Sequence, residues 1–180
     1  MKHLLINFTA FQVGWFACVL GAANGYPLVG PVIVLLVTAL HLAIAHEPRK
    51  ELSLIMVAAV IGACFDSLVV RTGWIAYPNG ILLDGTAPYW NVAMWLLFAT
   101  TLNVSLRWMR RNYAISALFG LVGGPLSYVA GAKLGGLVFI QTVPALAALA
   151  IGWAAIMPFL IWVSSRLDGM QRNDPVVQHA

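Results

Sequence analysis

Long apolar runs separated by short polar connections constrain the fold of this chain more than any other feature of its sequence. A membrane-spanning helix needs about 20 mostly apolar residues. Runs of about this length predict helices at residues 4–23, 28–45, 52–70, 90–106, 114–130 and 141–163. The sequence therefore predicts an all-α fold, a polytopic transmembrane bundle of six helices. We expect a single transmembrane domain at 1–168, followed by a polar cytoplasmic tail at 169–180.

The amino-acid composition argues against a soluble domain. Of the 180 residues, 61% are hydrophobic and only 9% are charged, whereas soluble domains have about 25% charged residues. A domain of this size still exposes roughly a third of its unfolded surface, so its core cannot hide so much apolar surface. The net charge of +4 does not indicate nucleic-acid binding, because the basic residues are dispersed between apolar runs. Lipid is therefore the expected solvent for most of the surface.

The positions of Lys and Arg predict that both termini lie in the cytoplasm (N-in/C-in). With this orientation only Arg71 and Lys133 lie outside, and basic residues favour the cytoplasmic side of a membrane. The cytoplasmic ones are Lys2, Arg49, Lys50, Arg107, Arg110, Arg111, Arg166 and Arg172. The first run is expected to remain as a helix rather than to be cleaved as a signal peptide, because Asn7 and Gln12 interrupt it. We expect a multi-pass protein of the bacterial inner membrane.

Asp66 is the most unusual residue in the predicted helices. An ionisable group at the centre of a bilayer costs on the order of 2.5–3.5 kcal/mol. Helical spacing places Asp66 on one face with Ala58 and Gly62, so another helix can approach it closely. Asp66 is then either a proton-relay or substrate-binding carboxylate, or a structural carboxylate that neighbouring side chains satisfy. The candidate neighbours are Asn91, Tyr128, Lys133 and Arg71.

A glycine-rich segment at 120–136 provides the second unusual feature. One helical stripe contains Tyr128 together with four glycines, namely Gly120, Gly124, Gly131 and Gly135. Such a stripe indicates either close helix packing or, because Pro125 interrupts it, a broken helix that lines a site. Lys133 falls on a different face, where its ammonium group can reach the membrane interface.

A second polar group is expected toward the cytoplasm, and it comprises Asn7, Gln12, His41 and Asn103. The spacing of His41 and His46 occurs in membrane di-iron desaturases, but those enzymes need several histidine boxes and this chain has only 4 His. The nucleophile-elbow, phosphate-loop and zinc-protease motifs are absent from the sequence. We therefore predict no catalytic residue, no metal and no cofactor.

Several motifs resemble a known family. They are Asn7 with Phe11-Gln12 and Gly14-Trp15, then Asp66, and then Gly-Pro-Leu-Ser-Tyr-Val-Ala-Gly-Ala-Lys-Leu-Gly at 124–135. Over about residues 3–168 the chain resembles the small bacterial inner-membrane proteins of domain-of-unknown-function family 2878. The resemblance implies a polytopic membrane protein and supplies no activity. Members occur beside genes for fatty-acid cyclopropanation and related lipid modification, which implies a role near membrane lipids.

Three functional hypotheses remain open. The leading one is a non-enzymatic accessory or interaction protein associated with membrane lipid or with a lipid-modifying partner. The second is a small transporter or permease with Asp66 as its coupling carboxylate, and the third is a membrane enzyme that acts on lipid through Asp66 or His41. The expected partners are membrane lipids and another membrane protein or a second copy of the chain, and no nucleic acid is expected.

Overall fold

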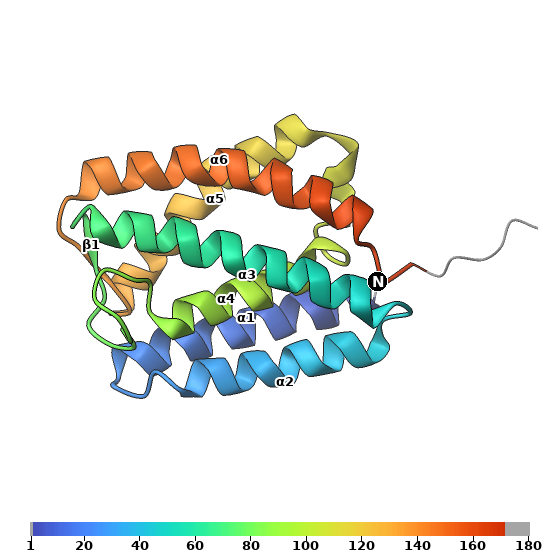
Figure 1. Ribbon diagram of the computed structural model, residues 1–180, viewed down its shortest axis with the longest axis horizontal. Helices are drawn as coiled ribbons and strands as arrows, with labels where there is room; N and C mark the ends of the chain where they lie inside the picture. The colour runs from blue at the N-terminus through green and yellow to red at the C-terminus, as the bar shows by residue number, and fades with distance from the viewer. Residues whose placement is uncertain (1, 172–180) are drawn as a thin grey trace, which may run out of the picture.

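Six α-helices make up most of the described chain, which comprises residues 2–171 of the computed structural model. Consecutive helices run in opposite directions along the molecule (Figure 1). They are α1 (Lys2–Ala23), α2 (Val29–Ile44), α3 (Pro48–Arg71), α4 (Tyr89–Leu102), α5 (Tyr113–Lys133) and α6 (Thr142–Arg166). The predicted all-α, six-helix bundle is confirmed. Most of the predicted tail at 169–180 lies outside the described residues.

The remaining regular structure is short. A 3-10 helix, η1 (Arg107–Arg111), follows α4. Two two-residue strands, β1 (Ile75–Ala76) and β2 (Val138–Phe139), pair antiparallel with Ile75 opposite Phe139. They join the α3–α4 connection to the α5–α6 connection at one end of the bundle (Figure 1).

Within residues 2–171, four helices are long and apolar enough to cross a membrane: α1, α3, α5 and α6. The other two are shorter, with 16 residues in α2 and 14 in α4. Helix α4 ends at Leu102, four residues before the predicted end at 106, because the chain turns there. The backbone N–H groups of Val104 and Leu106 both donate to the Thr101 carbonyl.

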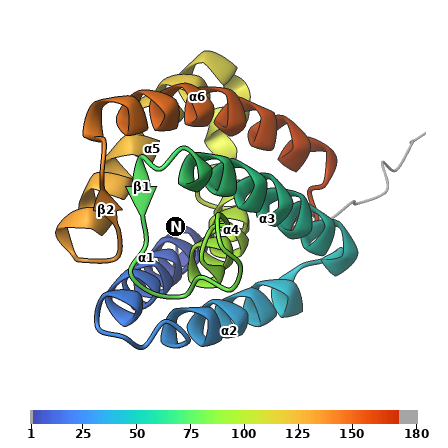
Figure 2. The same cartoon turned by 60° about the vertical axis from the view of Figure 1, so that its left-hand side comes forward.

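Helix α4 is the centre of the bundle. Trp90, Trp95, Leu97 and Leu102 on this helix are almost completely buried. Helices α1, α2 and α3 pack around α4, while α5 and α6 form a hairpin on the remaining side (Figure 2). A helix with this position has little contact with lipid, and its side chains meet those of the surrounding helices.

Small residues allow the helices to approach one another. A Cβ atom on Gly30 of α2 would lie 2.4 Å from the Cα atom of Cys18 in α1. A Cβ atom on Gly152 of α6 would lie 2.2 Å from the Phe65 ring of α3. Because any side chain at these positions would overlap its neighbour, the glycines set the distances between the helices.

Candidate functional site

Asp66 accepts hydrogen bonds from two other helices. Its side chain is buried, with 1% of the residue exposed. The Asn91 Nδ2 and Trp95 Nε1 atoms of α4 donate to Oδ2 over 2.6 and 2.7 Å. The Tyr128 hydroxyl of α5 donates to Oδ1. The structure thus brings together three of the residues expected to form one cluster, Asp66, Asn91 and Tyr128.

Trp95 is a member of this network that sequence reasoning missed. It follows Asn91 by one helical turn and therefore lies on the same face of α4. Gly62, one turn before Asp66, makes room for it, because a Cβ atom there would lie 2.1 Å from the indole ring. A small residue one turn from a buried carboxylate was the available signal for a large side chain from another helix.

The network compensates a group that is costly to bury. Every partner donates a hydrogen bond to Asp66, and an indole N–H can act only as a donor. The arrangement therefore suits a carboxylate acceptor. The remaining candidate neighbours are elsewhere. Lys133 is exposed at the end of α5, and Arg71 donates to the Gly85 carbonyl over 3.2 Å. Asp66 therefore forms no salt bridge with any described residue.

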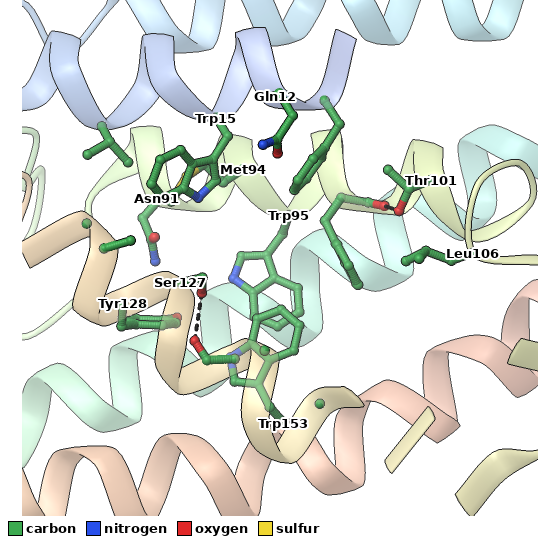
Figure 3. Close-up of a pocket in the computed structure, with 18 of the residues that line it drawn as sticks. Gln12, Trp15, Asn91, Met94, Trp95, Thr101, Leu106, Ser127, Tyr128 and Trp153 are labelled. Carbon is green, nitrogen blue, oxygen red and sulfur yellow. Dashed lines mark hydrogen bonds between the residues drawn. The ribbon is translucent and has the colours of Figure 1, made fainter. Parts of the chain in front are cut away.

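A cavity of about 440 Å³ lies beside this network, between α1, α4 and α5. Asn91, Trp95 and Tyr128 line it, whereas Asp66 lies behind them. Figure 3 shows Gln12 and Trp15 of α1 on one side of the cavity, with Tyr128 and Trp153 on the other. Asp66 thus holds in place three side chains that form the cavity wall.

Two stacked indoles form part of that wall. The rings of Trp95 and Trp153 are 4.6 Å apart and inclined by 14°, and Phe98 meets both rings edge-on. The Trp153 N–H is buried beside the Tyr128 hydroxyl, which donates to Asp66.

The cavity opens sideways, between α1 and α5. Helix α1 packs mainly on α2 and α4, whereas α5 packs mainly on α6. Phe8 of α1 and Phe119 of α5 line the cavity and are 55% and 46% exposed. One end of the gap is covered where Gly136 meets Val19. Near the other end, Asn7 of α1 accepts a 2.7 Å hydrogen bond from Ser105, which lies between α4 and η1. The opening therefore lies on the outer surface of the bundle.

The expected cytoplasmic cluster separates into distinct places. Gln12 lines the cavity. Asn7 donates to the Thr100 carbonyl over 3.0 Å and joins α1 to the end of α4. His41 and Asn103 both contact Glu51, which the sequence analysis had assigned to no helix.

Glu51 is completely buried at the start of α3, with 0% of the residue exposed. One carboxylate oxygen lies 2.8 Å from His41 Nε2. The other accepts from Asn103 Nδ2 over 2.5 Å and from the Gly169 backbone N–H over 2.7 Å. The buried positions Leu54, Ile55 and Ala58 continue the face on which Glu51 lies, so the periodicity of α3 was the missed signal.

Two arginines extend this cluster to the residues after α6. Arg110 donates to the Asn103 side chain, to the Ser164 carbonyl and, over 2.7 Å, to Asp168. Arg107 contacts both oxygens of Asp168. Burial alone would raise the pKa of Asp168, but the hydrogen bond from Arg110 and the charges of both arginines hold it below its usual value. These contacts fasten residues 167–169 to the bundle.

The glycines of α5 do not act as one stripe. A Cβ atom on Gly120 or Gly124 would lie 2.2 or 2.3 Å from Trp153 of α6, so these two allow close packing. At Gly131 the nearest such atom is 3.5 Å away, in Leu137. Gly135 lies outside the helix, with φ of 87°, in the turn where the Gly136 N–H donates to the Gly131 carbonyl. The expectation that Gly135 continues the helical stripe was wrong, because this turn ends α5 at Lys133.

Comparison with known proteins assigns a family to the sequence. The profile described as a protein of unknown function, DUF2878, matches residues 4–159 and confirms the resemblance noted in the sequence. No curated protein and no solved structure matches the chain.

Proposed function

The chain belongs to the DUF2878 family, whose description names no activity, and from the geometry of the site we propose that it binds a lipid chain within the membrane. The protein is a non-enzymatic accessory protein of the bacterial inner membrane, and the lipid enters between α1 and α5. The observation that carries this proposal is the apolar cavity that opens sideways between two membrane-spanning helices.

The size and lining of the cavity support a small-molecule ligand. Ligand sites usually measure about 300–1,000 Å³ and combine apolar walls with a few placed polar groups. The cavity measures about 440 Å³, and its aromatic walls contain the amides of Asn91 and Gln12. Lipid tails are as apolar as these walls, so selective binding would come from packing against the indoles and from the polar groups.

The position of Asp66 favours binding over transport. A coupling carboxylate must meet water from each side of the membrane in turn, whereas Asp66 is 1% exposed and does not line the cavity. Lipid chemistry at His41 is also disfavoured, because the ring is paired with Glu51 away from the cavity. Both arguments leave the cavity as a binding site.

Gly123→Leu tests the proposal by filling the cavity. Gly123 lines it, and a Cβ atom there would meet only the Phe119 ring at 3.6 Å, so the larger side chain extends into free space. The protein would be placed in nanodiscs of phospholipid with brominated chains, which quench nearby indoles. Replacing the exposed Trp108 and Trp162 by Phe lets the buried indoles dominate the fluorescence. We expect quenching in this background and the loss of most of it in Gly123→Leu.

Val122→Leu is the matched control, because Val122 is 50% exposed on the same helix and does not line the cavity. Its quenching should equal that of the background protein. Equal quenching in Gly123→Leu and the background would contradict the proposal. A dimer without bound lipid in native mass spectrometry would instead identify a second copy of the chain as the occupant of the groove.

A further inference from the structure

A second groove lies on another face of α4, between α2 and α3. Helices α2 and α3 both pack on α4 but make little contact with each other. Val92 and Leu96 of α4 form the floor of the groove, Leu35 of α2 forms one side and Ala63 of α3 forms the other. The groove measures about 510 Å³, and no charged residue of the described chain lines it. Because the rim residue Leu35 is 63% exposed, the groove opens on the outer surface of the bundle.

The connection between α3 and α4 covers one end of this groove with apolar side chains. Leu82 and Leu83 line the groove, yet they are 74% and 70% exposed, and the preceding Ile81 is 41% exposed. Consecutive large apolar side chains at the surface form a patch of the kind that marks contact with a partner or a membrane. Asp84 follows them and is exposed as well, so the apolar patch ends at a charged residue.

Two hydrogen bonds hold this connection beside the last turn of α3. The Ala87 backbone N–H donates to Ser67 Oγ over 3.0 Å, and Arg71 Nε donates to the Gly85 carbonyl over 3.2 Å. Ser67 lies four residues before the end of α3 at Arg71, which is about 6 Å along the helix axis. The connection therefore folds back along the side of the bundle, at the level where a spanning helix leaves the membrane.

The backbone of the connection is suited to this position, because several of its polar groups have partners within the protein. The Leu83 carbonyl accepts from the Thr86 backbone N–H and hydroxyl, and the Gly80 carbonyl accepts from the Tyr89 N–H over 3.0 Å. Irregular backbone at membrane depth requires such internal partners. These hydrogen bonds lower the cost of placing residues 81–83 against lipid.

We propose that the groove is a second lipid site, which takes an acyl chain of a phospholipid from the leaflet at the end of the bundle opposite the termini. Residues 81–83 insert into that leaflet beside the chain. An acyl chain fits because the walls are apolar, no described charge lies in the groove to bind a headgroup, and the opening adjoins α3, which is long enough to span the membrane. The proposal does not depend on ligand binding in the cavity between α1, α4 and α5.

Fluorescence depth measurements test the insertion of residues 81–83. In a background with Cys18→Ala and Cys64→Ala, Leu82→Cys and Asp84→Cys would each carry an environment-sensitive fluorophore in phospholipid nanodiscs. We expect position 82 to emit at shorter wavelength and to be quenched by phospholipids with a nitroxide on the acyl chain. Position 84 is the matched control, and a water-soluble paramagnetic ion should quench it instead. Equal emission and quenching at the two positions would overturn the insertion.

Photo-crosslinking tests the occupancy of the groove. The nanodiscs would contain phospholipid with a diazirine on the acyl chain, and mass spectrometry would locate the adducts. We expect adducts on Leu96, at the floor of the groove, and the loss of most of them in Ala63→Phe, whose ring fills the groove. Val60→Phe is the matched control, because Val60 is 58% exposed on the same helix and does not line the groove. Unchanged adducts on Leu68, which is 61% exposed on α3, would show that the loss is confined to the groove.

The outcomes of the photo-crosslinking separate an occupied groove from other arrangements. The absence of adducts on Leu96 in the unsubstituted protein would overturn the site, and so would equal adducts in Ala63→Phe and Val60→Phe. A dimer without lipid adducts in native mass spectrometry would instead identify a second copy of the chain as the occupant. Because the readouts are at position 82 and Leu96, their failure would leave the quenching of the indoles, and with it the proposed function, unaffected.

Discussion

Two buried carboxylates show how single residues are stabilised in this protein. Asp66 accepts from Asn91, Trp95 and Tyr128, and Glu51 accepts from an asparagine and a backbone N–H and contacts a histidine. In both cases the partners come from other parts of the chain, so each carboxylate joins segments that are distant in sequence. A buried acceptor of this kind is expensive to remove because its donors are then left without partners.

Asp66→Asn should lower the thermal stability of the protein in detergent. The amide replaces one acceptor oxygen by an NH₂ group, which faces at least one of the donors and leaves it unsatisfied. An unsatisfied buried group lowers the free energy of unfolding by about 1–3 kcal/mol. For a chain of this size each kcal/mol lowers the midpoint temperature of thermal unfolding by about 2–4 °C. Asp84→Asn is the control, because Asp84 lies in an exposed loop. Similar melting temperatures for the two variants would show that the network contributes little stability.

At the scale of elements, helix α5 combines two kinds of glycine. Gly120 and Gly124 face Trp153 of α6 so closely that no side chain fits, whereas Gly131 has an ordinary contact distance. In the sequence these positions are all glycines at helical spacing. In the structure the neighbouring helix approaches some of them closely and leaves space at another. The difference can be tested with one substitution at two positions.

Gly120→Ala should destabilise the α5–α6 hairpin, and Gly131→Ala should not. The new Cβ atom at 120 would lie 2.2 Å from the Trp153 carbonyl oxygen, which belongs to the backbone and cannot rotate away. Such overpacking costs about 1–3 kcal/mol, whereas alanine in an unhindered helix position stabilises by about 0.5–1 kcal/mol. Thermal unfolding in detergent would measure both effects. Equal stability of the two variants would contradict the close contact.

For the whole molecule, the distribution of charge agrees with an even number of membrane crossings. The described chain begins and ends at the same end of the bundle (Figure 1). Lys2, Arg107, Arg110 and Arg166 lie at that end, while Arg71 and Lys133 lie at the opposite end. Arg172 lies outside the described residues. The asymmetry favours placing the termini in the cytoplasm.

Cysteine labelling should establish this orientation. In a background with Cys18→Ala and Cys64→Ala, Asp84→Cys and Arg111→Cys place single thiols on exposed residues at opposite ends. A membrane-impermeant maleimide should label position 84 in intact spheroplasts and position 111 only after the membrane is opened. The reverse pattern would place the termini outside, and labelling of both positions in intact spheroplasts would contradict a bundle that spans the membrane.

The class of structure could be predicted from the amino-acid sequence alone. The length of the apolar runs predicted the number of helices, because burial in lipid requires a minimum length. Small residues around Asp66 indicated that it faces another helix, and the motifs identified the family. These properties can be inferred from neighbouring residues along one helix, without knowledge of how the helices pack.

Contacts between side chains of different helices could not be predicted from the sequence. Asp66 and Tyr128 are separated by 62 residues and Glu51 and Gly169 by 118, so their contacts depend on how the helices rotate and pack. Trp95 and Glu51 were not predicted for this reason, since neither an indole within a helix nor a carboxylate near a helix end has a fixed partner in the sequence. The cavity has the same origin: it exists because α1 packs on α4 while α5 packs on α6, which leaves their indoles and amides facing a shared space.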